Sequence, residues 1–481
     1  MQEQILSFVA KANGILADYI LIILLVGVGL FFTIKTRFVQ VRCFGEGMKK
    51  VFGNIKLFGG KEGSGLSSFQ ALATAVAAQV GTGNIVGASG AILTGGPGAI
   101  FWMWIIAFLG MATIYAEAVL AQETKIADDK GEIHGGPVYY IKRAFPNGFG
   151  SFLAGFFAIA VILALGFMGS MVQSNSIAGS METVFDANKA NILFSLGGID
   201  VTATAAIVGA IIALLAAIIF IGGIKRIASV TEKLVPIMAC IFLLGGLVII
   251  IARIQYIPAT IGMIFKYAFT PQALIGGGIG YALKTAISQG AKRGLFSNEA
   301  GMGSTPHAHA MADVEKPHDQ GVVAMVGVFL DTFVVLTMTA LVVISCLFAG
   351  ENGLAAAVDY QAAIETMGIT KANAMQLAAG GVFGTSFGSI FVAICLLFFA
   401  FSTILSWNFF GKLNVQYLFK NSKAATLVYS IIAIVFIFLG SLLSNDLVWE
   451  LTDFFNYLMV IPNAIALIAL YKIVVKNARN K

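Results

Sequence analysis

Long apolar stretches occupy most of this chain of 481 residues. Eleven of them reach roughly 18 residues or more, the length at which an α-helix begins to cross the hydrocarbon core of a bilayer. They cover residues 17–34, 66–93, 97–122, 150–178, 202–221, 232–252, 272–290, 320–349, 376–410, 424–443 and 447–475. Charged residues make up only 11% of the chain, compared with about 25% in a soluble domain. The sequence therefore predicts an all-α polytopic membrane protein with eleven transmembrane helices.

Lysine and arginine are distributed unevenly among the connections between these stretches. An odd number of spans puts the two termini on opposite sides of the membrane. With the N-terminus outside, the internal segments hold 24 of the 30 basic residues and the external segments hold five. Because cytoplasmic loops carry the excess of basic residues, we expect a protein of the cell membrane with an outer N-terminus and a cytoplasmic C-terminus. The net charge of +6 then reflects orientation, and no nucleic-acid partner is expected.

Two of the apolar stretches contain glycine-rich interruptions. One carries Gly81-Thr82-Gly83-Asn84 at its centre, and the other reads Gly-Gly-Gly-Ile-Gly at 276–280. Hydrocarbon offers no water to unpaired N–H and C=O groups, so a helix breaks at mid-depth only where it lines a protected cavity. Two broken helices in matching halves are typical of secondary transporters, in which the freed backbone binds substrate and ion. The alternative is that these glycines only allow close helix packing.

The span count also predicts an inverted repeat. Without the first span, ten remain, and each half of five begins with one of the interrupted stretches. An odd number of spans per half gives the two halves opposite topology, which is the arrangement of inverted-repeat transporters. The expected division is an extra helix and basic loop at 1–65, a first repeat at 66–252, a connection at 253–271, a second repeat at 272–476 and a tail at 477–481.

Three motifs resemble the alanine or glycine:cation symporter family, also called the sodium:alanine symporter family. They are GGPGAIFWMWIIAFLG at 95–110, GTGNIVG at 81–87 and SNEAGMGS at 297–304. The resemblance runs from the second span to the last. It implies import of L-alanine, glycine or a related small amino acid such as D-alanine, coupled to Na⁺ or H⁺. It also implies the leucine-transporter-type 5+5 fold with one additional N-terminal helix. No cofactor is expected beyond the coupling ion.

A zwitterionic amino acid needs an anion site and a cation site a few ångströms apart. The N-terminus of a half-helix offers N–H groups to a carboxylate, and the C-terminus of a half-helix offers carbonyls to an ammonium group. The residues expected to bind substrate are Gln79, Thr82, Gly83, Asn84, Gly276, Gly277, Gly278 and the apolar wall Phe167. Gln173 lies further outward on the same span as Phe167, and Trp407 is a candidate for closing the cytoplasmic side.

Two adjacent hydroxyls, Ser402 and Thr403, interrupt an apolar span. Such hydroxyls usually donate to the carbonyl one turn earlier in their own helix. Under the family resemblance, however, the matching helix contributes to a sodium site that the first broken helix completes. The ligands that the resemblance implies are the hydroxyls of Ser402 and Thr403 and the carbonyls of Phe399, Ala77 and Val80.

Carboxylates inside spans are costly and therefore indicate function or pairing. Asp331 and Glu117 are the two clear cases, and Lys284 is a possible partner. Asp331 is the residue that a proton-coupled variant would use, whereas Glu117 is expected to be structural.

An enzyme is the rival class. Its best evidence is His307-Ala308-His309 with Glu299 nearby, in a predicted cytoplasmic loop. Alternate residues on a helix point roughly 200° apart, so these two histidines cannot share one metal ion. The four cysteines form no CxxC pair and are expected to be packing residues. A channel is a weaker alternative, because a zwitterion-sized site suits alternating access better than continuous conduction.

Overall fold

Nearly all of the described chain is helical. The computed structural model describes residues 2–53, 66–128, 132–196, 199–271, 274 and 278–479. Within these residues the only named strands form two short antiparallel hairpins, β1–β2 (Ile126–Ala127 and Ile133–His134) and β3–β4 (Ile192–Leu196 and Ile199–Thr202). The all-α prediction is therefore confirmed.

The helices follow the apolar stretches along the chain. The N-terminal part holds α1 (Gln2–Ile15), α2 (Ile22–Lys35), α3 (Val39–Arg42), α4 (Phe44–Phe52), α5 (Ser68–Gln79) and α6 (Ala88–Gly95). The middle part holds α7 (Ala99–Thr124), α8 (Pro137–Ala144), α9 (Gly148–Val161), α10 (Ser170–Phe185), α11 (Ala203–Ile221), α12 (Gly223–Ala252) and α13 (Ile257–Phe269). The C-terminal part holds α15 (Ile279–Asn298), α16 (Pro306–Ala310), α17 (Pro317–Val328), α18 (Thr337–Val343), α19 (Tyr360–Thr366), α20 (Ala374–Phe383), α21 (Thr385–Leu418), α22 (Lys423–Leu442), α23 (Asn445–Ala469) and α24 (Tyr471–Arg479).

Several of these helices are continued by short tighter or wider helical turns. The π-helical segments are η1 (Leu16–Leu21), η2 (Gly83–Gly87), η3 (Ile162–Gly169), η5 (Phe329–Leu336) and η6 (Ile344–Phe348). The 3₁₀ turns are η4 (Ile254–Tyr256) and η7 (Leu354–Ala356). Because η3 joins α9 to α10, one continuous helix of 38 residues runs from Gly148 to Phe185.

Nine helices in the described residues are long and apolar enough to cross a membrane, and ten if the bent pair α5–α6 counts as one span. The predicted count of eleven is not reached by this measure. The missing stretch corresponds to α15, which carries Lys284, Lys292 and Arg293. The predicted span 376–410 was also wrong at its start, because α20 ends at Phe383 and Gly384, with a positive φ of 84°, separates it from α21.

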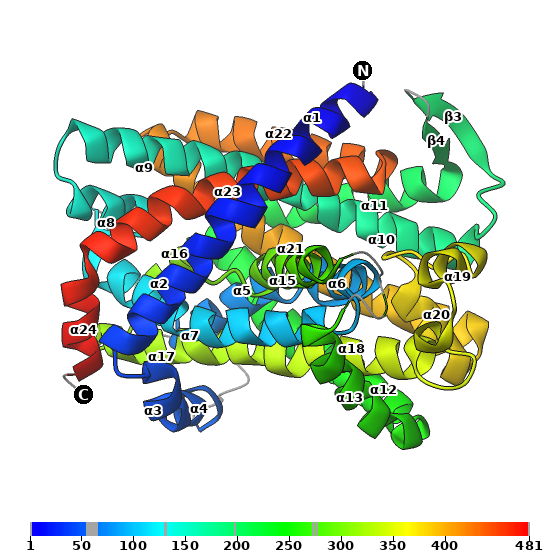
Figure 1. The fold of residues 1–481 in the computed structure, drawn as a ribbon. Helices are drawn as coiled ribbons and strands as arrows, with labels where there is room; N and C mark the ends of the chain where they lie inside the picture. The colour runs from blue at the N-terminus through cyan, green and yellow to red at the C-terminus, as the bar shows by residue number, and fades with distance from the viewer. Residues whose placement is uncertain are drawn as a thin grey trace.

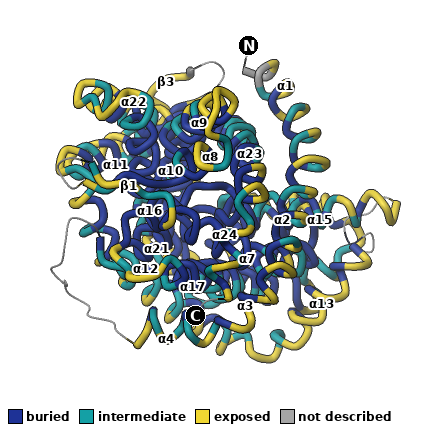
Figure 2. Tube along the Cα trace, turned by 90° about the vertical axis from the view of Figure 1, so that its left-hand side faces the viewer, coloured by how far each residue is buried: buried dark blue, intermediate teal, exposed yellow. Residues whose placement is uncertain are grey.

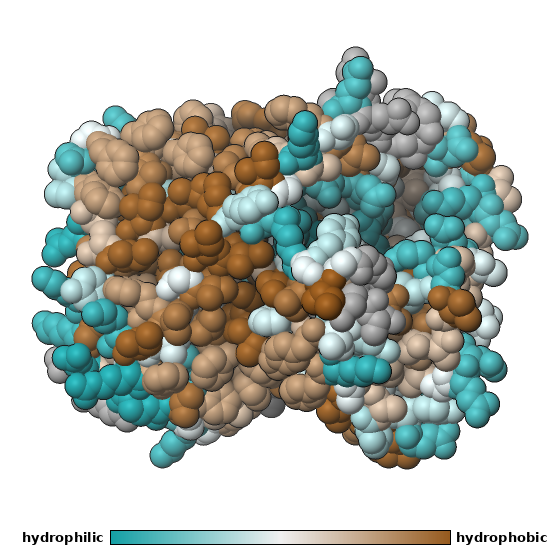
Figure 3. Space-filling view, viewed as in Figure 1, coloured by the Kyte–Doolittle hydropathy of each residue, from teal (hydrophilic) through white to brown (hydrophobic). Residues whose placement is uncertain are grey.

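The long helices lie side by side in a bundle, with the N-terminal helix across its face (Figure 1). Apolar side chains cover much of this face, and hydrophilic ones gather toward its two ends (Figure 3). Seen from the side, buried residues fill the interior, while the first helix packs along the outside (Figure 2). Inside the bundle α7 packs against α17 and α15, and α5 packs between α12 and α21. The broken segment α5–α6 is therefore enclosed by other helices.

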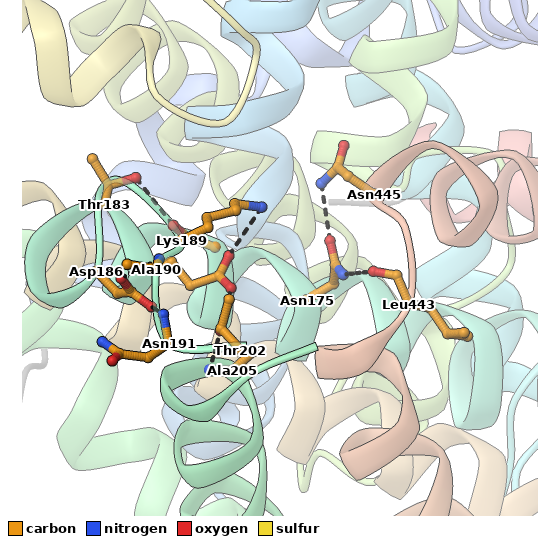
Figure 4. Close-up of polar contacts among 12 residues, drawn as sticks. Asn175, Thr183, Asp186, Lys189, Ala190, Asn191, Thr202, Ala205, Leu443 and Asn445 are labelled. Atoms are coloured by element: carbon orange, nitrogen blue, oxygen red, sulfur yellow. Dashed lines mark hydrogen bonds and ion pairs between the residues drawn. The ribbon is translucent and has the colours of Figure 1, made fainter. Parts of the chain in front are cut away.

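One end of the bundle is built from α19, α20 and the β3–β4 hairpin (Figure 1). Asp186 at the end of α10 accepts hydrogen bonds from the N–H groups of Ala190 and Asn191, which anchors the hairpin (Figure 4). Nearby, Asn175 donates to the Leu443 carbonyl at 2.8 Å (Figure 4). The short helix α19 begins after Asp359, whose side chain accepts a hydrogen bond from the N–H of Ala362.

Candidate functional site

The first interruption lies where it was predicted. A capping box between Ser67 and Gln70 starts α5, which ends at Gln79. Val80 leaves the helical conformation with ψ of 87°, and the following half runs from Gly83 to Gly95 at 44° to α5. A Cβ atom on Gly81 would collide with Thr403 Oγ1. Only glycine therefore fits at Gly81, because the backbone there lies directly against α21.

The two hydroxyls of α21 meet the end of α5. Thr403 Oγ1 donates to the Ala77 carbonyl at 2.8 Å and lies 3.1 Å from the Phe399 carbonyl. Ser402 Oγ donates to the Phe399 carbonyl at 2.8 Å and is 3.4 Å from the Ala77 carbonyl. Both hydroxyls are fully buried. Four of the five oxygen ligands named for the sodium site thus converge. The fifth belongs to Val80, the buried residue that directly follows α5.

Thr82 pairs with α10 across the interruption. Its N–H and its hydroxyl both donate to Gln173 Oε1, at 3.1 and 2.7 Å. The amide nitrogen of Gln173 is buried and has no hydrogen-bond partner. An unpaired buried donor costs about 1–3 kcal/mol, so this nitrogen is a candidate ligand-binding group. Gly83 lies against α15, where an added Cβ would be 3.0 Å from Ser297 Cα.

Asn84 links the first broken helix to a buried carboxylate. Its Nδ2 donates to Asp331 Oδ1 at 2.6 Å. Ser297 and Thr332 also donate to Asp331, at 2.9 and 2.8 Å to Oδ2. Asp331 is fully buried, and within the described residues no lysine or arginine lies within ion-pair distance of it. Asn84 Oδ1 meanwhile accepts from the N–H of Gly81, so the same side chain also braces the interruption.

A second interruption follows Asn298, beyond the predicted position at 276–280. Gly276 and Gly277 lie outside the described residues, and Gly278 is an exposed residue at the start of α15. The helix then runs to Asn298, where Glu299, Gly301 and Gly303 adopt positive φ angles of 58°, 91° and 80°. Three left-handed residues in five cannot continue a right-handed helix, so the chain unwinds until α16 begins.

The unwound segment 299–305 is held by buried carboxylates. Glu117 of α7 accepts from the N–H groups of Gly301 and Gly303, at 3.1 and 3.0 Å, and from Asn463 Nδ2 at 2.6 Å. The structural role predicted for Glu117 fits these contacts. Glu299 accepts from the Trp407 indole N–H and from the Ser304 hydroxyl. These bonds replace the helical ones that the backbone gives up.

The two interruptions lie in contact with each other. Gln79 Nε2 donates to the Asn298 carbonyl at 2.8 Å, which joins the end of α5 to the end of α15. The Trp407 ring packs against Phe296 at 5.8 Å between centroids, next to the same junction. Phe167 is placed elsewhere, since its ring stacks on Phe436 of α22 at 4.9 Å.

Several sequence expectations need correction here. His307 and His309 are buried at 1% exposure, not in a solvated loop. The His307 ring packs between Phe157 and Phe410, and its Nδ1 contacts the Ser304 carbonyl. Lys284 pairs with Asp18 of the first span at 2.9 Å instead of with Asp331 or Glu117.

Sequence reasoning did not place the residues 297–304 in the site. The sequence predicts a cytoplasmic segment here, because polar and basic residues lower the hydropathy of this region. The available signal was the density of Asn, Glu, Ser and Gly directly after an amphipathic helix, which resembles the pattern around Gly81. Two interruptions with facing N–H groups, carbonyls and neutral hydroxyls can hold a small zwitterion beside a hard cation.

The model of the sodium:alanine symporter family matches residues 2–480. The sodium/alanine symporter AgcS of Methanococcus maripaludis is 39% identical over 98% of this chain and 96% of its own. A putative sodium/proton-dependent alanine carrier, YrbD of Bacillus subtilis, is 39% identical over 97% of this chain and 90% of its own. A probable sodium/glutamine symporter of the same species, GlnT, is 36% identical over 98% and 90%.

The fold also matches a solved transporter structure. The match to the crystal structure of MhsT in complex with L-phenylalanine covers 87% of this chain and 97% of the MhsT chain. The TM-score is 0.57 and the sequence identity is 14%. This match supports the leucine-transporter-type fold alone. Membership of a transporter family sets the enzyme alternative aside. The three motifs, the two facing interruptions and the match over residues 2–480 lead to one conclusion: the chain belongs to the sodium:alanine symporter family.

Proposed function

We propose that this chain imports a small neutral amino acid, such as L-alanine, glycine or D-alanine, together with Na⁺ by alternating access. The observation that carries the proposal is the convergence of Ser402, Thr403 and the Ala77 carbonyl beside the interruption at Gly81. The names of the sodium/alanine and sodium/glutamine relatives support the ion and the substrate class.

Na⁺ binds where α21 meets the end of α5. Its ligands are the hydroxyls of Ser402 and Thr403 and the carbonyls of Ala77, Val80 and Phe399. In the structure these hydroxyls donate to the carbonyls of Phe399 and Ala77. When Na⁺ binds, they rotate their hydrogens away and present lone pairs to the ion. Five neutral oxygens suit a hard monovalent cation.

The substrate carboxylate binds the N–H groups at Thr82 and Gly83. In doing so it replaces Gln173 Oε1, which now accepts from Thr82. The unpartnered Gln173 Nε2 then gains an acceptor of its own. The ammonium group binds carbonyls at the end of α5 and at the second interruption, where Asn298 offers its carbonyl to Gln79. The sequence predicts that the carbonyls of Gly276, Gly277 and Gly278 bind the ammonium group. Gly276 and Gly277 lie outside the described residues.

Coupling follows from the backbone that both ligands share. Na⁺ on the carbonyl of Ala77 fixes the end of α5, and this orients the N–H groups at Thr82 for the substrate. One charge moving through 100 mV provides about 2.3 kcal/mol, enough for roughly fiftyfold accumulation before the Na⁺ gradient is counted.

Proton coupling through Asp331 is the second candidate. Asp331 is a fully buried carboxylate bound to Asn84, so its protonation would act directly on the first interruption. The description of the relative YrbD as a putative sodium/proton-dependent alanine carrier also favours this candidate.

The membrane arrangement is part of the same proposal. We place the N-terminus outside and the C-terminus in the cytoplasm, with α15–α16 as a further, interrupted crossing. The two five-span repeats then begin with α5–α6 and with α15–α16, within the predicted ranges 66–252 and 272–476.

Binding of labelled alanine to purified protein tests the site without requiring transport. Wild type is expected to bind in NaCl and not in choline chloride. Thr82→Ala and the pair Ser402→Ala with Thr403→Ala are expected to lose binding, whereas Thr285→Ala, at a partly exposed position on α15, keeps it. Wild-type binding by both site variants would contradict the assignment.

A further inference from the structure

Cys43, Glu46 and His318 bring three kinds of metal-ligating atom to one place outside the transport site. Cys43 lies between α3 and α4, Glu46 in the first turn of α4 and His318 in the first turn of α17. One ligand atom of each lies within 4.8 Å of the other two. We propose that these side chains bind a divalent metal ion of the zinc class, with water as the fourth ligand.

The distances suit a tetrahedral ion. His318 Nε2 lies 3.4 Å from Glu46 Oε1. Two ligands bound at about 2.0–2.1 Å in a tetrahedron are about 3.3–3.4 Å apart, so this pair already has the spacing of a bound state. A thiolate bound at about 2.3 Å stands about 3.6 Å from its neighbours. Cys43 therefore needs to approach by little more than 1 Å at most, within side-chain rotation.

The imidazole is oriented toward the other two ligands. His318 is only 2% exposed, and its Nε2 has no hydrogen-bond partner. Its Nδ1 lies 2.8 Å from the hydroxyl of Tyr115 in α7. When Nδ1 carries the proton and donates to Tyr115, the lone pair of Nε2 is directed at the space beside Glu46. Histidine ligands in metal sites are commonly oriented in this way by their second nitrogen, so Tyr115 is a positioning residue.

The ligand set selects the class of ion. Thiolate, imidazole and carboxylate together favour Zn²⁺ or Co²⁺ over Mg²⁺ and Ca²⁺, which prefer oxygen. The Glu46 side chain is 35% exposed, which gives the ion a route from solvent, while Cys43 is fully buried. A second group, Asp128, Glu132 and His134 on the β1–β2 hairpin, offers no thiolate and serves as a comparison.

A metal ion here would fasten α3 and α4 to α17. The ion pair Lys50–Asp319, at 3.1 Å, also joins α4 to α17. Both residues line a cavity of about 300 Å³, together with Ser67 and Ser68 at the start of α5. The proposed metal site therefore stabilises one wall of the cavity next to the first broken helix.

Cobalt titration of the purified full-length protein tests the proposal independently of transport. Wild type is expected to bind one Co²⁺ with a near-ultraviolet thiolate-to-cobalt absorption that Zn²⁺ removes. Cys43→Ser should abolish that absorption, and Glu46→Gln and His318→Asn should weaken binding at least 100-fold. Tyr115→Phe should weaken it about 10–100-fold, because the imidazole loses its orienting partner.

The controls are Cys395→Ser, a buried cysteine in α21, and His134→Asn in the hairpin group. Both should titrate like wild type. Folding of each variant is checked by its metal-free unfolding temperature, and the half-exposed Glu46→Gln provides a test if Cys43→Ser does not fold. Cobalt binding without the thiolate absorption in wild type, or equal weakening in His134→Asn, would overturn the proposal.

Discussion

Thr403→Val removes one hydroxyl from the proposed sodium site and keeps nearly the same side-chain shape. The Thr403 hydroxyl reaches the Ala77 carbonyl at 2.8 Å, across the gap between α21 and α5. A polar contact to a charged group contributes about 1.5–3 kcal/mol, which corresponds to roughly 10- to 150-fold in affinity. We therefore expect the half-saturating Na⁺ concentration to rise by that factor. Stability should fall by only about 0.5–1.5 kcal/mol, the cost of one neutral hydrogen bond.

The assay is Na⁺-dependent alanine uptake by proteoliposomes, with Na⁺ varied at saturating alanine. Thr452→Val is the matched control, because the buried Thr452 hydroxyl donates at 2.7 Å to the Val448 carbonyl within its own helix α23. Thr403→Ser keeps a hydroxyl and should restore most of the Na⁺ affinity. If Thr403→Val shifts the Na⁺ dependence no more than Thr452→Val does, the Thr403 hydroxyl only bonds to its own helix and the sodium-site argument fails.

Three further changes test the substrate site and the two helix interruptions. Gln173→Leu should raise the half-saturating alanine concentration about tenfold or more at saturating Na⁺, because a donor to the substrate carboxylate is lost. An unchanged alanine dependence would contradict this role of Gln173. Gly83→Ala should lower the free energy of unfolding by about 1–3 kcal/mol, because the added Cβ would lie 3.0 Å from Phe296 and Ser297. Gly155→Ala, where the added Cβ meets open space, should leave it unchanged. Thermal unfolding in detergent distinguishes the two variants. Glu117→Ala should destabilise the protein strongly, because the N–H groups of Gly301 and Gly303 lose their acceptor, at a cost of about 1–3 kcal/mol each. Glu123→Gln, at the exposed end of α7, should have no such effect. Equal unfolding temperatures of the two variants would contradict the role of Glu117.

The first interruption could be predicted from the sequence because its cause is local. Glycines and small polar residues within an otherwise apolar stretch leave few alternatives to a break at Gly81. The hydroxyls of Ser402 and Thr403 were found because they stand out in an apolar helix. Their contact with Ala77 is long-range, and in the sequence only the resemblance to a family connects the two segments.

The second interruption was misplaced because hydropathy does not include pairing. Lys292 and Arg293 lower the apolar character of α15, yet they pair with Asp18 and Asp453 at 3.6 and 3.0 Å. Glu299 is likewise buried because Trp407 donates to it from α21. These partners come from distant parts of the chain, so hydropathy alone does not show that this polar segment is internal. The glycine run at 276–280 was the more conspicuous pattern, but Gly278 precedes α15.

The proposed function requires that Na⁺ drives the uptake of a small neutral amino acid. The direct measurement is labelled alanine uptake by proteoliposomes under an inward Na⁺ gradient, compared with an inward H⁺ gradient in Na⁺-free buffer. We expect uptake with Na⁺ alone, loss of that uptake when Ser402 and Thr403 are both replaced by alanine, and no uptake with H⁺ alone. Uptake driven by H⁺ in Na⁺-free buffer, abolished by Asp331→Asn, would contradict the account and assign the coupling to Asp331.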